Sequence, residues 1–231
     1  VTVSEFSARE IESLYGVPRD HVRVIHNGVS EEFTPLCNDQ VKAELRTRWS
    51  IPSAGFILFV GGADPRKNHA GFLKAVAICR SQLGGRAVVL VGDAEHPQGS
   101  YAATAQSLGL AQEVRCTGRL DREDLRKLYS CTDLFVFPSL YEGFGMPVLE
   151  AMACGAPTIT SSTSSLPEVA GDAALLVDPD DVEGLAQAMM NIVSDADLQR
   201  NLRQRGYERA RLFTWQRAAR STSALYHELC T

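Results

Sequence analysis

Short runs of apolar residues recur through the middle of the chain, separated by stretches with the length and pattern of helices. Six of these runs read as buried strands: 56–60, 87–91, 114–116, 134–136, 157–160 and 174–177. Near-continuous apolar strands that alternate with helices are typical of a parallel sheet covered on both faces. We therefore predict a doubly wound α/β domain with a six-stranded parallel sheet. Its ligands are expected beyond the carboxyl ends of the strands.

The first residues of the chain follow a less regular pattern. Ser7 is a candidate N-cap for a helix that runs to about Tyr15, and residues 22–25 resemble a short strand. Asp39 is a plausible N-cap for a second helix that ends near Trp49. Because the chain opens on Val1 in a strand-like segment, we expect it to be truncated.

After residue 181 the pattern is helical to the end, with breaks near Ser194 and at residues 213–214. A buried stripe is predicted at helical spacing from Leu198, Leu202, Tyr207 and Leu212. The arginines between them are expected to form a solvated face: Arg200, Arg203, Arg205 and Arg209.

Composition narrows the functional class. The 231 residues are 45% apolar and 22% charged, which is ordinary for a globular protein with a sizeable core. A net charge of −5 argues against electrostatic binding of nucleic acid. No apolar run reaches the ~20 residues that cross a bilayer, and the start does not resemble a signal peptide. Six scattered cysteines fit reduced thiols, so a cytoplasmic location is expected.

The segment 139–155 carries the most unusual chemistry. Pro147 is well placed to open a helix, and that helix is apolar except for Glu150. A lone buried carboxylate is costly unless it is paired or hydrogen-bonded. The sequence leaves two explanations open, a salt bridge to an arginine or hydroxyl donors from a ligand. Glu142 supplies a second carboxylate, beside glycines that let a ligand approach the backbone closely.

A second loop follows the first predicted strand of the domain. Gly61 and Gly62 permit close backbone approach, and Arg66 and Lys67 then open a predicted helix. Positive charge and a helix N-terminus at one strand end suit a diphosphate. The alternative is an exposed basic turn.

The segment 142–155 resembles a known signature. It reads Glu142-Gly-Phe-Gly-Met-Pro-Val-Leu-Glu150, followed by Ala-Met-Ala-Cys-Gly155. The signature is the Glu-x7-Glu motif of retaining GT-B glycosyltransferases of the GT4 group. The resemblance implies a nucleotide-diphosphate sugar, GDP- or UDP-linked, as substrate, with no cofactor and no metal. The group transfers the sugar to a glycan or lipid-linked acceptor.

The resemblance also assigns roles to individual residues. Glu142 would hold hydroxyls of the donor sugar, Glu150 would accept from the ribose, and Arg66 and Lys67 would bind the diphosphate. Glu142, Arg66 and Lys67 are thus the predicted catalytic residues, and neither glutamate is expected to act as a nucleophile. The other predicted donor-binding residues are Gly61, Gly62, Arg119, Leu120, Gly143, Phe144, Gly145, Met146 and Leu149. Among them, Arg119 and Leu120 would line the pocket for the base.

The same resemblance divides the chain. Residues 1–35 match the end of an N-terminal, acceptor-binding domain and a linker, and residues 36–231 match the nucleotide-sugar-binding domain. The rest of the acceptor domain is expected to be missing, so the chain would bind donor but transfer poorly. The last segment, 215–228, would rest on residues 1–35. In a full-length enzyme, peripheral attachment to a membrane stays open.

The donor is predicted less sharply. The motif region looks most like bacterial mannosyltransferases of polysaccharide assembly, which suggests GDP-mannose, with a UDP-hexose as the rival. The stretch 94–101 is the least family-like and leaves base and sugar unsettled. Two other functions remain open, a nucleotide-sugar-binding module without catalysis and a GT-B-like epimerase.

Acidic pairs could be mistaken for a metal site. Asp178-x-Asp180 and Asp195-x-Asp197 each precede a predicted helix, where Asp is a favoured cap. The five histidines show no spacing typical of metal ligands. His26 and His69 fall near predicted strand or helix ends, and we expect both to be turn or surface residues.

Overall fold

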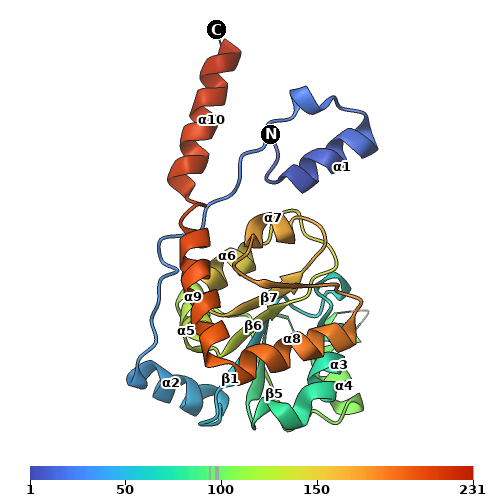
Figure 1. Cartoon of the computed structure of the whole chain (residues 1–231), viewed down its shortest axis with the longest axis vertical. Helices are drawn as coiled ribbons and strands as arrows, with labels where there is room; N and C mark the ends of the chain where they lie inside the picture. Colours follow the sequence, from blue (N-terminus) through green and yellow to red (C-terminus); the bar gives the residue numbers. More distant parts are fainter. Residues whose placement is uncertain (94, 97–98, 231) are drawn as a thin grey trace.

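The predicted parallel sheet is present and forms the centre of the molecule (Figure 1). The computed structural model describes residues 1–93, 95–96 and 99–230. The six strands lie in the order β5-β2-β1-β6-β7-β8, and every neighbouring pair is parallel. β3 and β4 form a separate antiparallel pair. The doubly wound α/β architecture is therefore confirmed.

Each predicted strand of the sheet matches an observed one to within two residues at either end. The strands are β1 (Phe56–Val60), β2 (Ala87–Val91), β3 (Glu95–His96), β4 (Gly99–Ser100), β5 (Val114–Gly118), β6 (Leu134–Phe137), β7 (Thr158–Ser161) and β8 (Leu175–Val177). The α-helices are α1 (Glu5–Tyr15), α2 (Asp39–Trp49), α3 (His69–Cys79), α4 (Tyr101–Ser107), α5 (Arg122–Cys131), α6 (Met146–Ala153), α7 (Leu166–Ala170), α8 (Val182–Ser194), α9 (Ala196–Ala210) and α10 (Trp215–Cys230). Short 3₁₀ turns occupy Arg19–His21, Pro65–Lys67 and Arg80–Leu83.

The apolar strands are buried because helices cover both faces of the sheet. On one face, Leu58 and Phe135 pack beneath α2, α5 and α6. On the other, Ile57 and Val136 pack against α3, α4 and α8. Alternate residues of each strand thus enter different cores, as the period of a strand requires. Burial on both sides explains why the strands are apolar without interruption.

The first helix starts earlier than predicted. Ser4, not Ser7, is the N-cap of α1, and its hydroxyl accepts from the N–H of Ser7. Residues 22–25 contribute only an isolated bridge, between Val24 and Thr2. The cap of α2 is likewise one residue early, at Asn38. Serine and asparagine are both favoured N-cap residues, so more than one residue near a helix start could cap it. Tertiary contacts determine which one does.

The C-terminal helices break where predicted, but their arginines do not form one solvated face. Arg203 donates to the carbonyls of Thr132 and Gly155, and Arg209 donates to those of Glu168 and Val169. The expectation for these two residues was wrong, because Arg203 binds carbonyls just after α5 and α6 and Arg209 binds carbonyls within α7. Leu212 is half exposed and leaves the predicted stripe.

Residues 1–27 and α10 project from the same end of the molecule, beyond α7 (Figure 1). At the base of this projection Val29 donates to the carbonyl of Phe213 at 3.0 Å. Farther out, Arg23 and Glu228 form an exposed ion pair at 3.0 Å. α10 therefore does lie beside the first residues of the chain, although none of its described residues is buried. No helix among the described residues is long and apolar enough to cross a membrane.

Candidate functional site

The loops that follow β1 and β6 meet at the carboxyl edge of the sheet. Ser139, just after β6, donates its hydroxyl to the carbonyl of Arg66 at 2.9 Å. The N–H of Leu140 reaches the same carbonyl at 2.8 Å. Two loops separated by some seventy residues in sequence are thereby fixed side by side. The predicted diphosphate loop and the Glu142 loop share one site.

Two of the predicted catalytic residues contact each other. Lys67 Nζ lies 2.6 Å from Glu142 Oε1, and the two side chains are only 18% and 13% exposed. Ser139 Oγ lies 2.7 Å from the same oxygen, so its single proton is shared between Glu142 and the Arg66 carbonyl. The Lys67 ammonium sits 5.1 Å above the Phe137 ring. Glu142 Oε2 accepts from none of the described residues. An ammonium has three hydrogens, so Lys67 can bind a further anion while it stays paired with Glu142.

Arg66 points elsewhere. Its guanidinium pairs with Asp64 at 2.9 Å and is more than half exposed. Arg66 and Lys67 were predicted to open the following helix. They lie instead in the 3₁₀ turn before it. α3 begins at His69, with Asn68 as its N-cap. Of the two basic side chains, only that of Lys67 therefore contacts the Glu142 loop.

The glycine loop after β1 packs against the loop after β2. Gly61 and Gly62 both donate to the carbonyl of Val91, at 3.0 and 3.4 Å. Gly92 has φ +125°, and a Cβ there would lie 2.4 Å from the nitrogen of Gly62. The two strand ends can approach this closely only because Gly92 lacks a side chain.

The amino end of α6 has no side-chain cap, because its N-cap residue is a glycine. Gly145, at φ +114°, is the N-cap, and no side chain caps the helix. Among the described residues, the N–H groups of Phe144, Gly145 and Met146 have no acceptor. The neighbouring carbonyls are occupied, since the buried Ser165 hydroxyl lies within 2.9 Å of those of Glu142 and Phe144. Unused N–H groups at a helix N-terminus favour an anion or an oxygen-rich ligand.

Glu150 lies farther along α6, within the apolar helix as expected. Its Oε2 accepts from the Tyr129 hydroxyl at 3.3 Å, and no cation of the described residues lies within ion-pair distance. Burial raises the pKa of the Glu150 carboxyl above its ordinary value, although Tyr129 and the more distant Arg122 oppose the rise. The salt-bridge explanation is therefore wrong. The other explanation, ligand hydroxyls as donors to this carboxylate, stays a prediction.

The raised pKa predicts a pH-dependent stability. Folded chains keep a proton on Glu150 where unfolded chains have released it, so the free energy of unfolding falls as pH rises from the ordinary carboxyl pKa through the raised one. We expect Glu150→Gln to raise the melting temperature at pH 7.5 more than at pH 4. Thermal unfolding at both pH values tests this, with the exposed Glu12→Gln as control. A melting difference that is independent of pH would contradict the prediction.

The residues predicted for the base lie at the next strand end. Arg119 is 81% exposed and binds both oxygens of Asp93, at 2.8 and 2.6 Å. Hydrogen bonding to Arg119 lowers the pKa of the Asp93 carboxyl. Leu120 is partly buried against the core. Within the stretch 94–101, which is expected to tune the base and sugar, residues 94, 97 and 98 lie outside the described residues.

The acidic pairs serve as turn and cap residues. Asp195 caps α9 by accepting from the N–H groups of Asp197 and Leu198. The cap of α8 is Asp181, one residue beyond the predicted pair, while Asp178 accepts from the N–H of Asp180. Within residues 1–93, 95–96 and 99–230, no three metal-ligating side chains gather.

Of the two histidines expected to be turn or surface residues, only His69 departs from that expectation, because His26 lies in a loop with its side chain 40% exposed. His69 is buried in α3 and its ring meets that of Tyr101. His26 Nε2 lies 2.7 Å from Glu168 Oε1, and its ring contacts Phe144 and Phe213. Residue spacing carries no signal for either contact, because the partners are far away in sequence.

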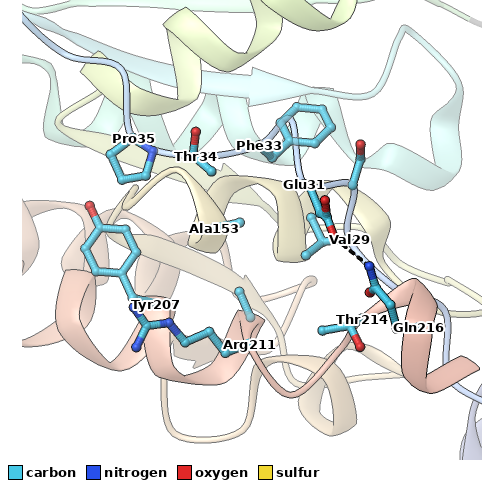
Figure 2. Close-up of a pocket in the computed structure, with 12 residues that line it drawn as sticks. Val29, Glu31, Phe33, Thr34, Pro35, Ala153, Tyr207, Arg211, Thr214 and Gln216 are labelled. Carbon is cyan, nitrogen blue, oxygen red and sulfur yellow. Dashed lines mark hydrogen bonds between the residues drawn. The ribbon is translucent and has the colours of Figure 1, made fainter.

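A cavity of about 430 Å³ lies elsewhere, between the segment after residue 28 and helix α9 (Figure 2). Figure 2 shows Phe33 and Pro35 on one side and Tyr207 and Arg211 on the other. Ala153, at the carboxyl end of α6, forms part of the wall. None of the predicted donor-binding residues lines this cavity. It is therefore separate from the candidate site.

Comparison with known proteins decides the family. The sequence pattern of the family described as "Glycosyl transferases group 1" matches residues 41–209. The chain belongs to this family. The match covers well over half of the chain, and it confirms the resemblance first indicated by the Glu142–Glu150 motif.

The relatives of this glycosyl transferase domain include bacterial mannosyltransferases. O-antigen chain mannosyltransferase B of Escherichia coli is 31% identical over 227 residues, which cover 98% of this chain and 59% of the relative. A serotype-specific mannosyltransferase, WbdA, of the same species is 33% identical over 221 residues, covering 94% of this chain and 27% of the relative. The chain thus spans less than two thirds of the length of either.

Solved structures agree on the fold. Sucrose-phosphate synthase from Thermosynechococcus elongatus superposes with a TM-score of 0.79 at 30% identity, covering 99% of this chain and 57% of that one. Anabaena Alr3699/HepE in complex with UDP-glucose gives a TM-score of 0.83 at 22% identity, covering 96% and 63%. At that identity the second comparison shows the fold alone.

Proposed function

We propose that the chain is the donor-binding half of a retaining glycosyltransferase that moves a hexose from a nucleotide-diphosphate sugar to a glycan or lipid-linked acceptor. The observation that carries the proposal is the Lys67–Glu142 pair beside the open amino end of α6. One site then offers a cation, a carboxylate and unused N–H groups. These are the groups that a phosphate and a sugar hydroxyl need.

The contacts support separate roles for the glutamates and the basic residues in binding the sugar, the ribose and the diphosphate. Glu142 Oε1 is occupied by Lys67 and Ser139, so Oε2 is the oxygen available to a sugar hydroxyl. Glu150 accepts from Tyr129 through Oε2, which leaves Oε1 for a ribose hydroxyl. Lys67 would face the diphosphate with its remaining N–H bonds. Arg66 is exposed, so it can turn from Asp64 to the phosphates without disturbing packed groups.

Transfer of a sugar proceeds through an oxocarbenium-like transition state while negative charge grows on the departing diphosphate. Lys67 and the amino end of α6 would stabilise that charge as fixed groups that need little rearrangement. The glutamates position the donor through hydrogen bonds.

Mannose is the favoured sugar, supported by the mannosyltransferase relatives at 31% and 33% identity, and a GDP-linked donor follows from the resemblance of the motif region. The acceptor would be bound by chain that the relatives have and this sequence does not span. On its own, residues 1–231 would therefore bind donor and transfer poorly.

Calorimetric titration of the purified chain with GDP-mannose and UDP-glucose tests the proposal. We expect saturable binding, tighter for GDP-mannose, and a loss of at least about tenfold in Glu150→Ala, because a hydrogen bond to a charged group is removed. Glu183→Ala, on α8, is the matched control. Absence of binding by either nucleotide sugar would contradict the proposed donor site, and efficient transfer by this chain alone would contradict its role as half an enzyme.

A further inference from the structure

The amino end of α1 lies directly on the loop that connects Glu142 to α6. The carbonyl of Gly143 accepts from the hydroxyls of Ser4 and Ser7, at 2.8 and 3.1 Å. Ser4 is fully buried, and the phenyl ring of Phe6 meets the ring of Tyr141 edge-on at 5.4 Å. A segment at the very start of the chain thus contacts the loop predicted to hold the donor sugar.

A carboxylate on α7 holds this helix end in place. Glu168 accepts from the N–H groups of Glu5 and Phe6, at 2.9 and 3.2 Å, and lies 2.7 Å from His26. Burial alone would raise the pKa of Glu168, but these hydrogen bonds outweigh it and the pKa lies below its ordinary value. Arg209 in turn donates to the backbone carbonyls of Glu168 and Val169. The position of α1 on the loop is therefore fixed from both sides of its first turn.

Hydrogen bonds from serine hydroxyls set the orientation of the peptide groups in the loop of residues 142–146. Ser165 holds the carbonyls of Glu142 and Phe144, and the serines of α1 hold the carbonyl between them. In a trans peptide the N–H points opposite to the carbonyl. The bond from Gly143 to α1 therefore directs the N–H of Phe144 away from α1. With glycine at 143 and 145, the backbone alone would not select this orientation.

We propose that Ser4 and Ser7 are positioning residues for the donor sugar, acting by holding the Gly143 carbonyl so that the N–H of Phe144 is presented to a sugar hydroxyl. The inference rests on the proposed function, since it assigns the Glu142–Met146 loop to the sugar. It adds that the sugar site is completed by residues outside the nucleotide-binding sheet. Recognition of the nucleotide does not depend on this contact, because Lys67 and Glu150 make no contact with α1 among the described residues.

The test compares a nucleotide sugar with its nucleoside diphosphate. Calorimetry with GDP-mannose and GDP, or with UDP-glucose and UDP if that donor binds better, should show about fivefold weaker nucleotide-sugar binding in Ser7→Ala. Adding Ser4→Gly, which keeps an acceptable N-cap, should bring the loss to about twentyfold. Affinity for the nucleoside diphosphate should stay within about twofold. Ser7→Thr, which keeps the hydroxyl, should restore binding, and the exposed Arg9→Ala should leave both affinities unchanged.

A ligand-free readout accompanies the titrations. With ¹⁵N-phenylalanine labelling, the amide nitrogen of Phe144 should shift in Ser7→Ala and not in Arg9→Ala, because the hydrogen bond to the preceding carbonyl is lost. Unchanged nucleotide-sugar affinity in the serine variants, or an equal loss for the nucleoside diphosphate, would overturn the inference. If the unaltered chain bound neither ligand, the proposed function itself would fall and this inference with it.

Discussion

Lys67→Ala should weaken binding of a nucleoside diphosphate about 30-fold or more. The ammonium of Lys67 is the least exposed cation at the loop after β1 and lies 2.6 Å from Glu142. Its removal deletes a charge-assisted contact to phosphate, worth about 1.5–3 kcal/mol. It also leaves the largely buried Glu142 carboxylate without its partner, which repels an incoming anion. Calorimetric titration with GDP and UDP measures the loss.

Two further variants separate these causes. Lys74→Ala removes the same side chain from an exposed position on α3 and should not change affinity. Glu142→Gln in the Lys67→Ala background should recover part of the loss, because the repelling charge is gone. The double-mutant comparison then gives the coupling between the two residues. Tight nucleoside diphosphate binding by Lys67→Ala would rule out a phosphate-binding role for this lysine.

Gly92→Ala should destabilise the fold by about 2–4 kcal/mol, the range for forced overpacking and strain. A Cβ at Gly92 would meet backbone atoms of Gly62 at 2.4 and 2.7 Å, and φ +125° is itself unfavourable for alanine. Backbone atoms cannot move aside as a flexible side chain can. At about 2–4 °C per kcal/mol for a chain of this size, we expect the melting temperature to fall by roughly 10 °C.

Gly109→Ala is the matched control for this effect. Gly109 also has positive φ, +71°, but no atom would lie within 4 Å of its Cβ. Gly109→Ala should therefore cost only the strain of placing an alanine at positive φ, about 1–2 kcal/mol. Scanning calorimetry of both variants measures the difference. Equal melting temperatures would show that the contact between the β1 and β2 loops tolerates a methyl group.

The sheet was predictable because its signal is local and strong. Apolar runs of five residues such as 56–60 and 87–91 are the length of strands buried on both faces, and the alternation with helices favours a parallel arrangement. The partly buried setting of Glu150 followed from the same reasoning, since its helix has almost no other polar residue. In both cases neighbouring residues carry the information.

The parts that were missed depend on contacts between distant residues. Ser4 reaches Gly143 across 139 positions, and Arg203 reaches Gly155 across 48. Serine and arginine are common on surfaces, so nothing in their local sequence separates a buried hydrogen-bonding role from a solvated one. The Lys67–Glu142 pair was similar, as both residues were predicted for the site without being predicted to touch. Sequence reasoning found the members of the site and not their mutual contacts.

The hydrogen bond from Val29 to Phe213 also has an optical consequence. The two segments that join this projection to the sheet domain, near residue 28 and at residues 213–214, meet at this bond. Trp215, two residues past the bond, is half exposed at this point. The other tryptophan, Trp49, ends α2 beneath the guanidinium of Arg48. With Trp49→Phe, the tryptophan fluorescence comes from Trp215 alone and reports on the base of this projection.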